Sequence, residues 1–213
     1  MQNFLSEVDT IKVFERFRKN NPKPKGELKF TSPYTLLVAV VCSAQSTDKG
    51  VNLATAKLFR EANTPSKMVL LGEERIIELI RTIGLYRNKA KNIIGLSKVL
   101  LGKYESKVPK NLELLEQLPG VGRKTANVVL NIAYGFPTIA VDTHVFRVSN
   151  RTTIAPGKNV REVETILNER VPKKFLVYAH HWLILHGRYV CKARSPLCNE
   201  CLISDLCPSR FLV

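Results

Sequence analysis

Apolar residues recur along most of the chain at the three- and four-residue spacing of amphipathic helices. Between basic residues, the pattern opens with Val8, Ile11, Phe14 and Phe17. Such a repeat predicts a helix with one buried face. The same reasoning predicts further helices over residues 33–41, 47–60, 73–82, 88–101, 111–118, 125–134, 142–151, 160–171 and 174–186. No alternating strand pattern is present, so we predict an all-α fold of about nine or ten helices.

Three polar residues mark the starts of predicted helices. Ser32 precedes Pro33 and a strongly apolar segment, Thr47 precedes the next helix, and Asp142 follows a short apolar run. Ser, Thr and Asp side chains accept hydrogen bonds from main-chain N–H groups of the first helical turn, and Pro fits the first helical position. We therefore expect all three residues to be N-caps.

One stretch near the middle of the chain joins two of these helices through a tight turn: Leu118-Pro119-Gly120-Val121-Gly122-Arg123-Lys124-Thr125-Ala126. Pro119 and Gly120 end the first helix, and Gly122 is expected to let the backbone turn tightly. The second helix then begins with free N–H groups and the positive end of its dipole, which suit a phosphate. From these residues alone, a phosphate clamp and a simple packing corner are equally supported.

The charge of the chain favours a polyanionic partner. The 213 residues include 33 Lys and Arg against 18 Asp and Glu, a net charge of +15. Nucleic acid is favoured over an acidic membrane surface. No apolar run is long enough for a transmembrane helix, and residues 1–10 lack the pattern of a secretory signal. We expect a protein of a reducing cytosol that has no membrane association.

Four cysteines lie close together in the tail with the spacing C-x6-C-x2-C-x5-C: Cys191, Cys198, Cys201 and Cys207. Thiols in a reducing compartment are more often ligands than disulfides. The tail lacks periodicity, so it has little core of its own to hold it. The spacing admits zinc or an iron–sulfur cluster and does not decide between them. Cys42 lies in an apolar helix and is expected to be a small buried residue.

The hairpin, the segment Val141–Val148 and the cysteine tail together resemble the endonuclease III family. These are bacterial DNA glycosylases and apurinic/apyrimidinic lyases of the helix-hairpin-helix superfamily. The resemblance covers nearly the whole chain, including Ser43-Ala44-Gln45, Gly84-Leu85-Tyr86 and residues 180–188. It implies a 4Fe–4S cluster on the four cysteines. It also implies two helical lobes with a DNA-binding cleft: residues 25–134, which end in the hairpin, and residues 1–24 plus 135–213, which carry the cluster.

The resemblance assigns catalysis to two residues. A glycosylase that also cuts the backbone needs an amine to attack C1′ of the damaged nucleotide, and Lys124 matches the family's lysine. Asp142 follows 18 residues later, and its carboxylate can stabilise positive charge on the sugar. We expect DNA to lie across the cleft between Lys124 and Asp142. The simpler alternatives are a surface lysine and an N-cap, and Asp142 can be cap and catalyst at once.

DNA contacts are expected at three places. A base must be flipped out of the duplex before it can be excised, and Gln45 and Leu85 match the residues that fill the gap. Gly120, Val121 and Gly122 are expected to hold the DNA backbone through main-chain donors, beside Arg123. A second, basic edge is expected from residues of the tail and the helix before it, namely Arg188, Lys192 and Arg194.

The function that these features predict is excision of oxidised or ring-damaged pyrimidines, followed by β-elimination 3′ to the abasic site. The predicted partner is double-stranded DNA that contains damaged bases or abasic sites, bound by a monomer in the bacterial cytoplasm near the nucleoid. An adenine-mismatch glycosylase is the closest alternative, but that group lacks a lysine at the position of Lys124 and usually carries an added C-terminal domain. A non-catalytic binder of damaged DNA is the alternative from another class.

Overall fold

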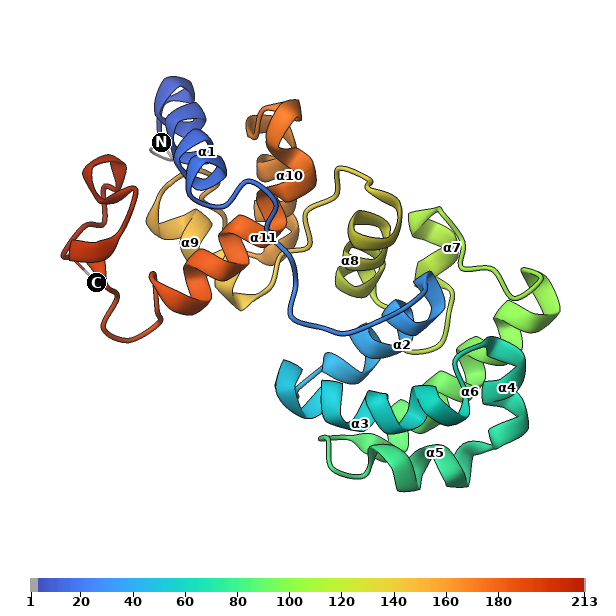
Figure 1. Cartoon of the computed structure of the whole chain (residues 1–213). Coiled ribbons are helices and arrows are strands. Elements are labelled where there is room, and N and C mark those ends of the chain that lie inside the picture. The colour runs from blue at the N-terminus through green and yellow to red at the C-terminus, as the bar shows by residue number, and fades with distance from the viewer. Residues whose placement is uncertain (1–3, 213) are drawn as a thin grey trace. The chain divides into compact units, whose positions relative to one another are not determined.

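The computed structural model describes residues 4–212, and its contacts divide the chain into two compact units (Figure 1). One unit is continuous, Glu27–Gly135, and the other joins the residues up to Gly26 to those from Phe136 onward. The described residues form eleven α-helices and two 3₁₀ turns, without a strand. The all-α prediction is confirmed, and the expected helix count was too low.

The continuous unit is built around one buried helix, α2. Its residues from Tyr34 to Cys42 are all buried, as expected for a helix that is apolar on every side. It packs against α3, α6 and α8. The helices of this unit are α2 (Pro33–Ser43), α3 (Asp48–Glu61), α4 (Pro65–Leu71), α5 (Glu73–Ile80), α6 (Tyr86–Lys103), α7 (Leu112–Glu116) and α8 (Arg123–Tyr134).

Polar caps set the starts of several of these helices. The Ser32 side chain accepts from the Thr35 main-chain N–H in a capping box, and the Thr47 side chain accepts from the N–H of Gly50. Both predicted N-caps are confirmed. The helix that was not predicted, α4, starts in the same way, with Thr64 as the cap and Pro65 at the first position.

The second unit has an aromatic core. Phe14 stacks on Phe175 with ring centroids 5.8 Å apart, and Trp182 lies against both rings. The Trp182 indole N–H donates to the main-chain oxygen of Asn21 at 2.8 Å, so the chain leaving α1 is fixed to α11. The elements of this unit are α1 (Glu7–Asn20), α9 (Thr143–Arg151), α10 (Val160–Arg170), α11 (Lys173–Tyr189) and the turns η1 (Cys198–Glu200) and η2 (Ser204–Leu206).

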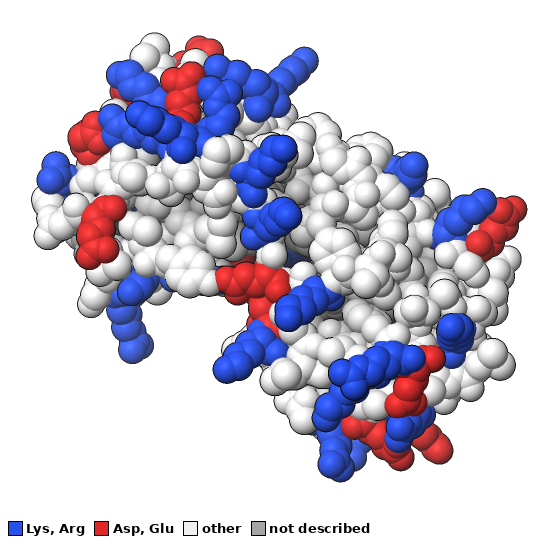
Figure 2. Space-filling view, in the orientation of Figure 1, with Lys and Arg blue, Asp and Glu red and all other residues white. Residues whose placement is uncertain are grey.

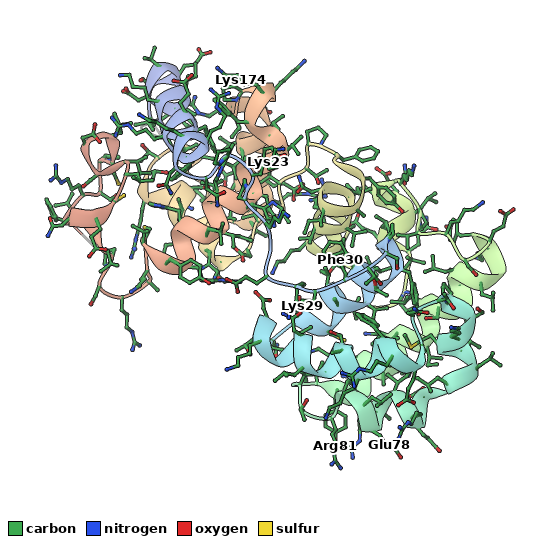
Figure 3. All side chains as sticks on the ribbon, viewed as in Figure 1. Lys23, Lys29, Phe30, Glu78, Arg81 and Lys174 are labelled. Carbon is green, nitrogen blue, oxygen red and sulfur yellow. The ribbon has the colours of Figure 1, made fainter. Side chains whose placement is uncertain are left out.

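Basic side chains are scattered over the surface of each unit (Figure 2). Lys and Arg are spread over the face seen in Figure 2, with acidic residues between them. Glu78 extends from α5, Arg81 follows the end of that helix, and Lys29 lies on the segment that leads to α2 (Figure 3). None of the helices within residues 4–212 has the length and apolar character that a bilayer span requires.

Candidate functional site

The hairpin between α7 and α8 is anchored by two buried apolar side chains. Leu118 is 2% and Val121 5% exposed, and the Val121 N–H donates to the Leu118 carbonyl at 3.0 Å. Gly120 adopts a φ of +75°, and a Cβ there would lie 2.7 Å from the side chain of Asn92. Only glycine fits this position without displacing Asn92.

Two expectations for this turn are corrected. Because the Val121 N–H is already bonded within the turn, it is not available to DNA, and Val121 serves as an apolar anchor. Gly122 has an extended backbone with φ of −90°, and a Cβ there would meet nothing within 4 Å. The tight turn therefore depends on Gly120, and Gly122 occupies the N-cap position of α8.

The first turn of α8 combines main-chain donors that lack intrahelical acceptors with an exposed amine. Gly122 has no side chain to cap the helix, so the N–H groups of Arg123, Lys124 and Thr125 lack intrahelical acceptors. Lys124 is exposed, and no described residue forms a hydrogen bond or ion pair with its ammonium group. The Arg123 guanidinium lies 3.9 Å from the Glu116 carboxylate across the hairpin. Such an end suits a phosphate.

Asp142 is held as the N-cap of α9, which confirms that prediction. Its Oδ1 accepts from the N–H groups of His144 at 2.9 Å and Val145 at 2.8 Å, and the residue is half-buried. The segment that leads to it is also fixed, because the buried His180 hydrogen-bonds through Nδ1 to the Ala140 carbonyl at 2.8 Å. The sequence did not indicate this contact between His180 and the segment before Asp142.

Arg147 connects α9 to the start of the cysteine tail, which the sequence did not indicate. Its Nε donates to the Cys191 carbonyl at 3.0 Å, and its Nη2 donates to the Gly187 carbonyl at 2.7 Å. The same Nη2 lies 3.1 Å from Nδ1 of His144. These hydrogen bonds join α9, the helix that begins at Asp142, to the start of the cysteine tail. We therefore expect the position of α9 to depend on whether the tail is ordered.

The four tail cysteines line one cavity as free, half-buried thiols. Within residues 4–212, no three His, Cys, Asp or Glu side chains converge as on a single ion. Burial raises the pKa of Cys201 and of Cys207. Arg151 donates to Cys191 Sγ at 3.6 Å and to the Lys192 carbonyl at 2.7 Å. Four half-buried thiols around one cavity fit a thiolate-bound cluster.

The remaining predicted DNA-contacting residues lie at exposed or half-exposed positions. Gln45 follows the end of α2, and Leu85 is the N-cap of α6; both belong to the continuous unit. Lys192 and Arg194 are exposed in the tail, and Arg188 is half-buried in the last turn of α11. Each unit therefore carries its own set of candidate contacts.

Comparison with known proteins identifies the class. Residues 38–173 match the HhH-GPD superfamily of base excision DNA repair proteins, and residues 191–207 match the iron–sulfur binding domain of endonuclease III. Endonuclease III of Escherichia coli K12 is 57% identical over 203 residues, which cover 95% of this chain and 96% of that protein. Endonuclease III of Haemophilus influenzae is 55% identical over the same shares of the two chains.

Comparison with solved structures supports the same assignment. A trapped endonuclease III–DNA covalent intermediate matches with a TM-score of 0.91 at 43% identity, covering 98% of this chain and 99% of that one. A thermostable thymine-DNA glycosylase shares the fold, with a TM-score of 0.78 at 22% identity. This chain belongs to the endonuclease III family of base excision DNA repair proteins. Its cofactor is an iron–sulfur cluster, and the prediction of 4Fe–4S in place of zinc is confirmed.

Proposed function

We propose that this protein is a bifunctional DNA glycosylase and apurinic/apyrimidinic lyase. It excises oxidised or ring-damaged pyrimidines from double-stranded DNA and then cleaves the strand 3′ to the abasic site. The observation that carries the proposal is the exposed amine of Lys124 on the uncapped first turn of α8, in a chain 57% identical to an endonuclease III. A phosphate held by the main-chain N–H groups of this turn places the neighbouring sugar within reach of that amine.

The chemistry follows from an amine nucleophile. The Lys124 nitrogen, once deprotonated, bonds to C1′ as the glycosidic C–N bond breaks, and the base leaves with the bonding electrons and takes up a proton. The sugar ring then opens to a Schiff base. Removal of a C2′ proton sends electrons toward the iminium and expels the 3′ phosphate by β-elimination. We assign the stabilisation of positive charge on the sugar to Asp142, whose carboxylate is fixed in position by two N–H donors.

We assign different roles in DNA binding to three sets of residues. Gln45 and Leu85 fill the gap left by the flipped base, and the turn at Gly120 and Gly122, with Arg123, holds the strand. Arg188, Lys192 and Arg194 form a basic second edge, and the 4Fe–4S cluster on the four tail cysteines shapes the loop that bears it. We infer that the two compact units are the two lobes of the enzyme. It acts as a monomer in the bacterial cytoplasm, near the nucleoid.

Borohydride trapping tests this function. The protein is incubated with a duplex that bears one thymine glycol, in the presence of borohydride. A covalent protein–DNA adduct that is lost in Lys124→Ala supports the lyase mechanism. Turnover without an adduct would favour a monofunctional glycosylase of the adenine-mismatch kind, and binding without turnover would favour a non-catalytic binder.

A further inference from the structure

Two exposed residues of the continuous unit share an unusual backbone conformation. Gln45 has a φ of 52° and Leu85 a φ of 56°, both in the left-handed region. Side chains other than glycine rarely adopt this conformation, because the Cβ crowds the following carbonyl. Leu85 is also 52% exposed. Such strain persists only where neighbouring contacts enforce it, and it is commonly found at functional positions.

The loops that carry these residues touch each other. A Cβ at Gly84 would lie 3.1 Å from the Gln45 main-chain oxygen and 3.9 Å from Ser46 Oγ. The turn after α2 therefore packs directly against the chain that leads into α6. Residues forty positions apart form one local structure.

Lys89 joins the two loops by hydrogen bonds. Its ammonium donates to the Ala44 carbonyl at 2.6 Å and to Ser46 Oγ at 3.0 Å, the residues on either side of Gln45. Its own N–H donates to the Leu85 carbonyl at 3.0 Å. This last bond is the main-chain hydrogen bond that begins α6, so the link that depends on the lysine side chain is the one to Ala44 and Ser46.

This lysine occupies an unfavourable position. It is 4% exposed, it lies in the first turn of α6, where the helix dipole disfavours a cation, and burial lowers its pKa. No carboxylate among the described residues forms an ion pair with it. A buried ammonium that is bonded only to a carbonyl and a hydroxyl loses hydration free energy. Its hydrogen bonds to the loop are the compensation that the structure provides.

We propose that Lys89 is the positioning residue of the DNA-insertion surface, defined as Gln45 and Leu85. Its ammonium holds the Ala44–Ser46 turn against the start of α6, so that both side chains stand ready before DNA binds. The inference rests on the proposed insertion role of Gln45 and Leu85. Preorganisation of this kind removes the ordering cost that a loose loop would add when a base is flipped.

Lys89→Met tests the proposal, because methionine keeps an apolar stem and removes the three donors. We expect single-turnover excision of thymine glycol from a duplex to slow by about 10- to 100-fold, the cost of a small misplacement of a positioned group. Strand cleavage at an abasic site in single-stranded DNA should stay within about twofold, since no base must be flipped there. Lys98→Met, at an exposed position on the same helix, is the matched control and should resemble wild type on both substrates.

A double-mutant cycle separates positioning from a general loss of structure. If Lys89 acts through the insertion surface, Lys89→Met should add little to the double variant Gln45→Ala, Leu85→Ala. If Lys89→Met fails to fold, Ser46→Ala replaces it, because it removes one acceptor of the ammonium. In thermal unfolding and iron content, either variant should resemble wild type.

Each contrary outcome overturns the inference in a distinguishable way. Wild-type excision by Lys89→Met, or equal slowing on both substrates with full additivity in the cycle, would show that Lys89 does not position the surface. Unchanged duplex excision by Gln45→Ala, Leu85→Ala would remove the insertion role itself, while the adduct at Lys124 would still form.

Discussion

Lys124 and Asp142 both stand at the N-terminus of a helix, yet the two helices present them in opposite ways. Asp142 is the cap of α9, half-buried, with one carboxylate oxygen bonded to two N–H groups. Lys124 is exposed on an uncapped helix, and no described residue holds its amine. A group that stabilises charge works best when it is already in place. A nucleophile must move as its bond to C1′ forms, and an unpaired side chain allows this.

The largest expected loss of activity comes from substitution of Lys124, the exposed residue of the pair. Lys124→Ala should abolish borohydride trapping and lower strand cleavage by at least ~10³-fold, because our proposal assigns the attacking amine to Lys124 alone. Lys107→Ala, which removes an exposed lysine of the same unit, should leave both intact. Gel analysis of trapped adducts measures the difference. An adduct of wild-type yield in Lys124→Ala would reassign the nucleophile.

Substitution of Asp142, the hydrogen-bonded residue of the pair, should cause a smaller loss of activity and leave the fold intact. Asp142→Asn retains an oxygen that accepts from the first turn of α9, so we expect stability to fall by less than ~1 kcal/mol. If Asp142 stabilises positive charge on the sugar as we propose, removal of the carboxylate charge should remove most base excision, about 100-fold. Asp142→Ala should lose both the cap and the activity. Unchanged turnover in Asp142→Asn would reduce this residue to a structural cap.

The two units should also differ in their dependence on iron. Cys198→Ser should lower iron content and thermal stability, because binding of the cluster contributes to the folding of the tail. It should weaken duplex binding about tenfold through disorder of the basic edge. Cys42→Ala, in the buried helix of the other unit, should keep its iron and its visible absorbance. Full iron content in Cys198→Ser would mean that this thiol is not a ligand.

The smallest expected effects separate the two glycines of the hairpin. Gly120→Ala places a methyl group 2.7 Å from Asn92 at a positive φ and should cost ~1–3 kcal/mol of unfolding free energy. Gly122→Ala meets no neighbour, so stability should stay within ~0.5 kcal/mol. Because its methyl group lies at the N-terminus of α8, it should still weaken duplex binding a few fold. Equal effects of both substitutions on stability would contradict the different roles described for them.

Local rules account for what the sequence predicted well. The caps at Ser32, Thr47 and Asp142 depend on hydrogen bonds within a few residues, so their patterns can be recognised in the sequence. The helix α4 was missed because one short helix offers too few apolar positions to define a period. Its signal, Thr64 before Pro65, was nevertheless present.

What the sequence could not show depends on contacts between distant segments. The apolar residues of α6 lie among several lysines, and nothing local distinguishes buried Lys89 from its exposed neighbour Lys91. Gln45 and Leu85 adopt a left-handed backbone that neither residue prefers, in two loops that touch only in the folded chain. The three contacts of Arg147, with Cys191, His144 and Gly187, likewise form only when α9, α11 and the tail come together.

The central claim is that the amine of Lys124 attacks the sugar. The most direct measurement is to trap the wild-type protein on a thymine glycol duplex with borohydride, digest the adduct and locate the DNA remnant by mass spectrometry. Our account predicts that the remnant is attached to Lys124, in the peptide that begins the α8 helix. A remnant on any other lysine, or on the N-terminal amine, would contradict it.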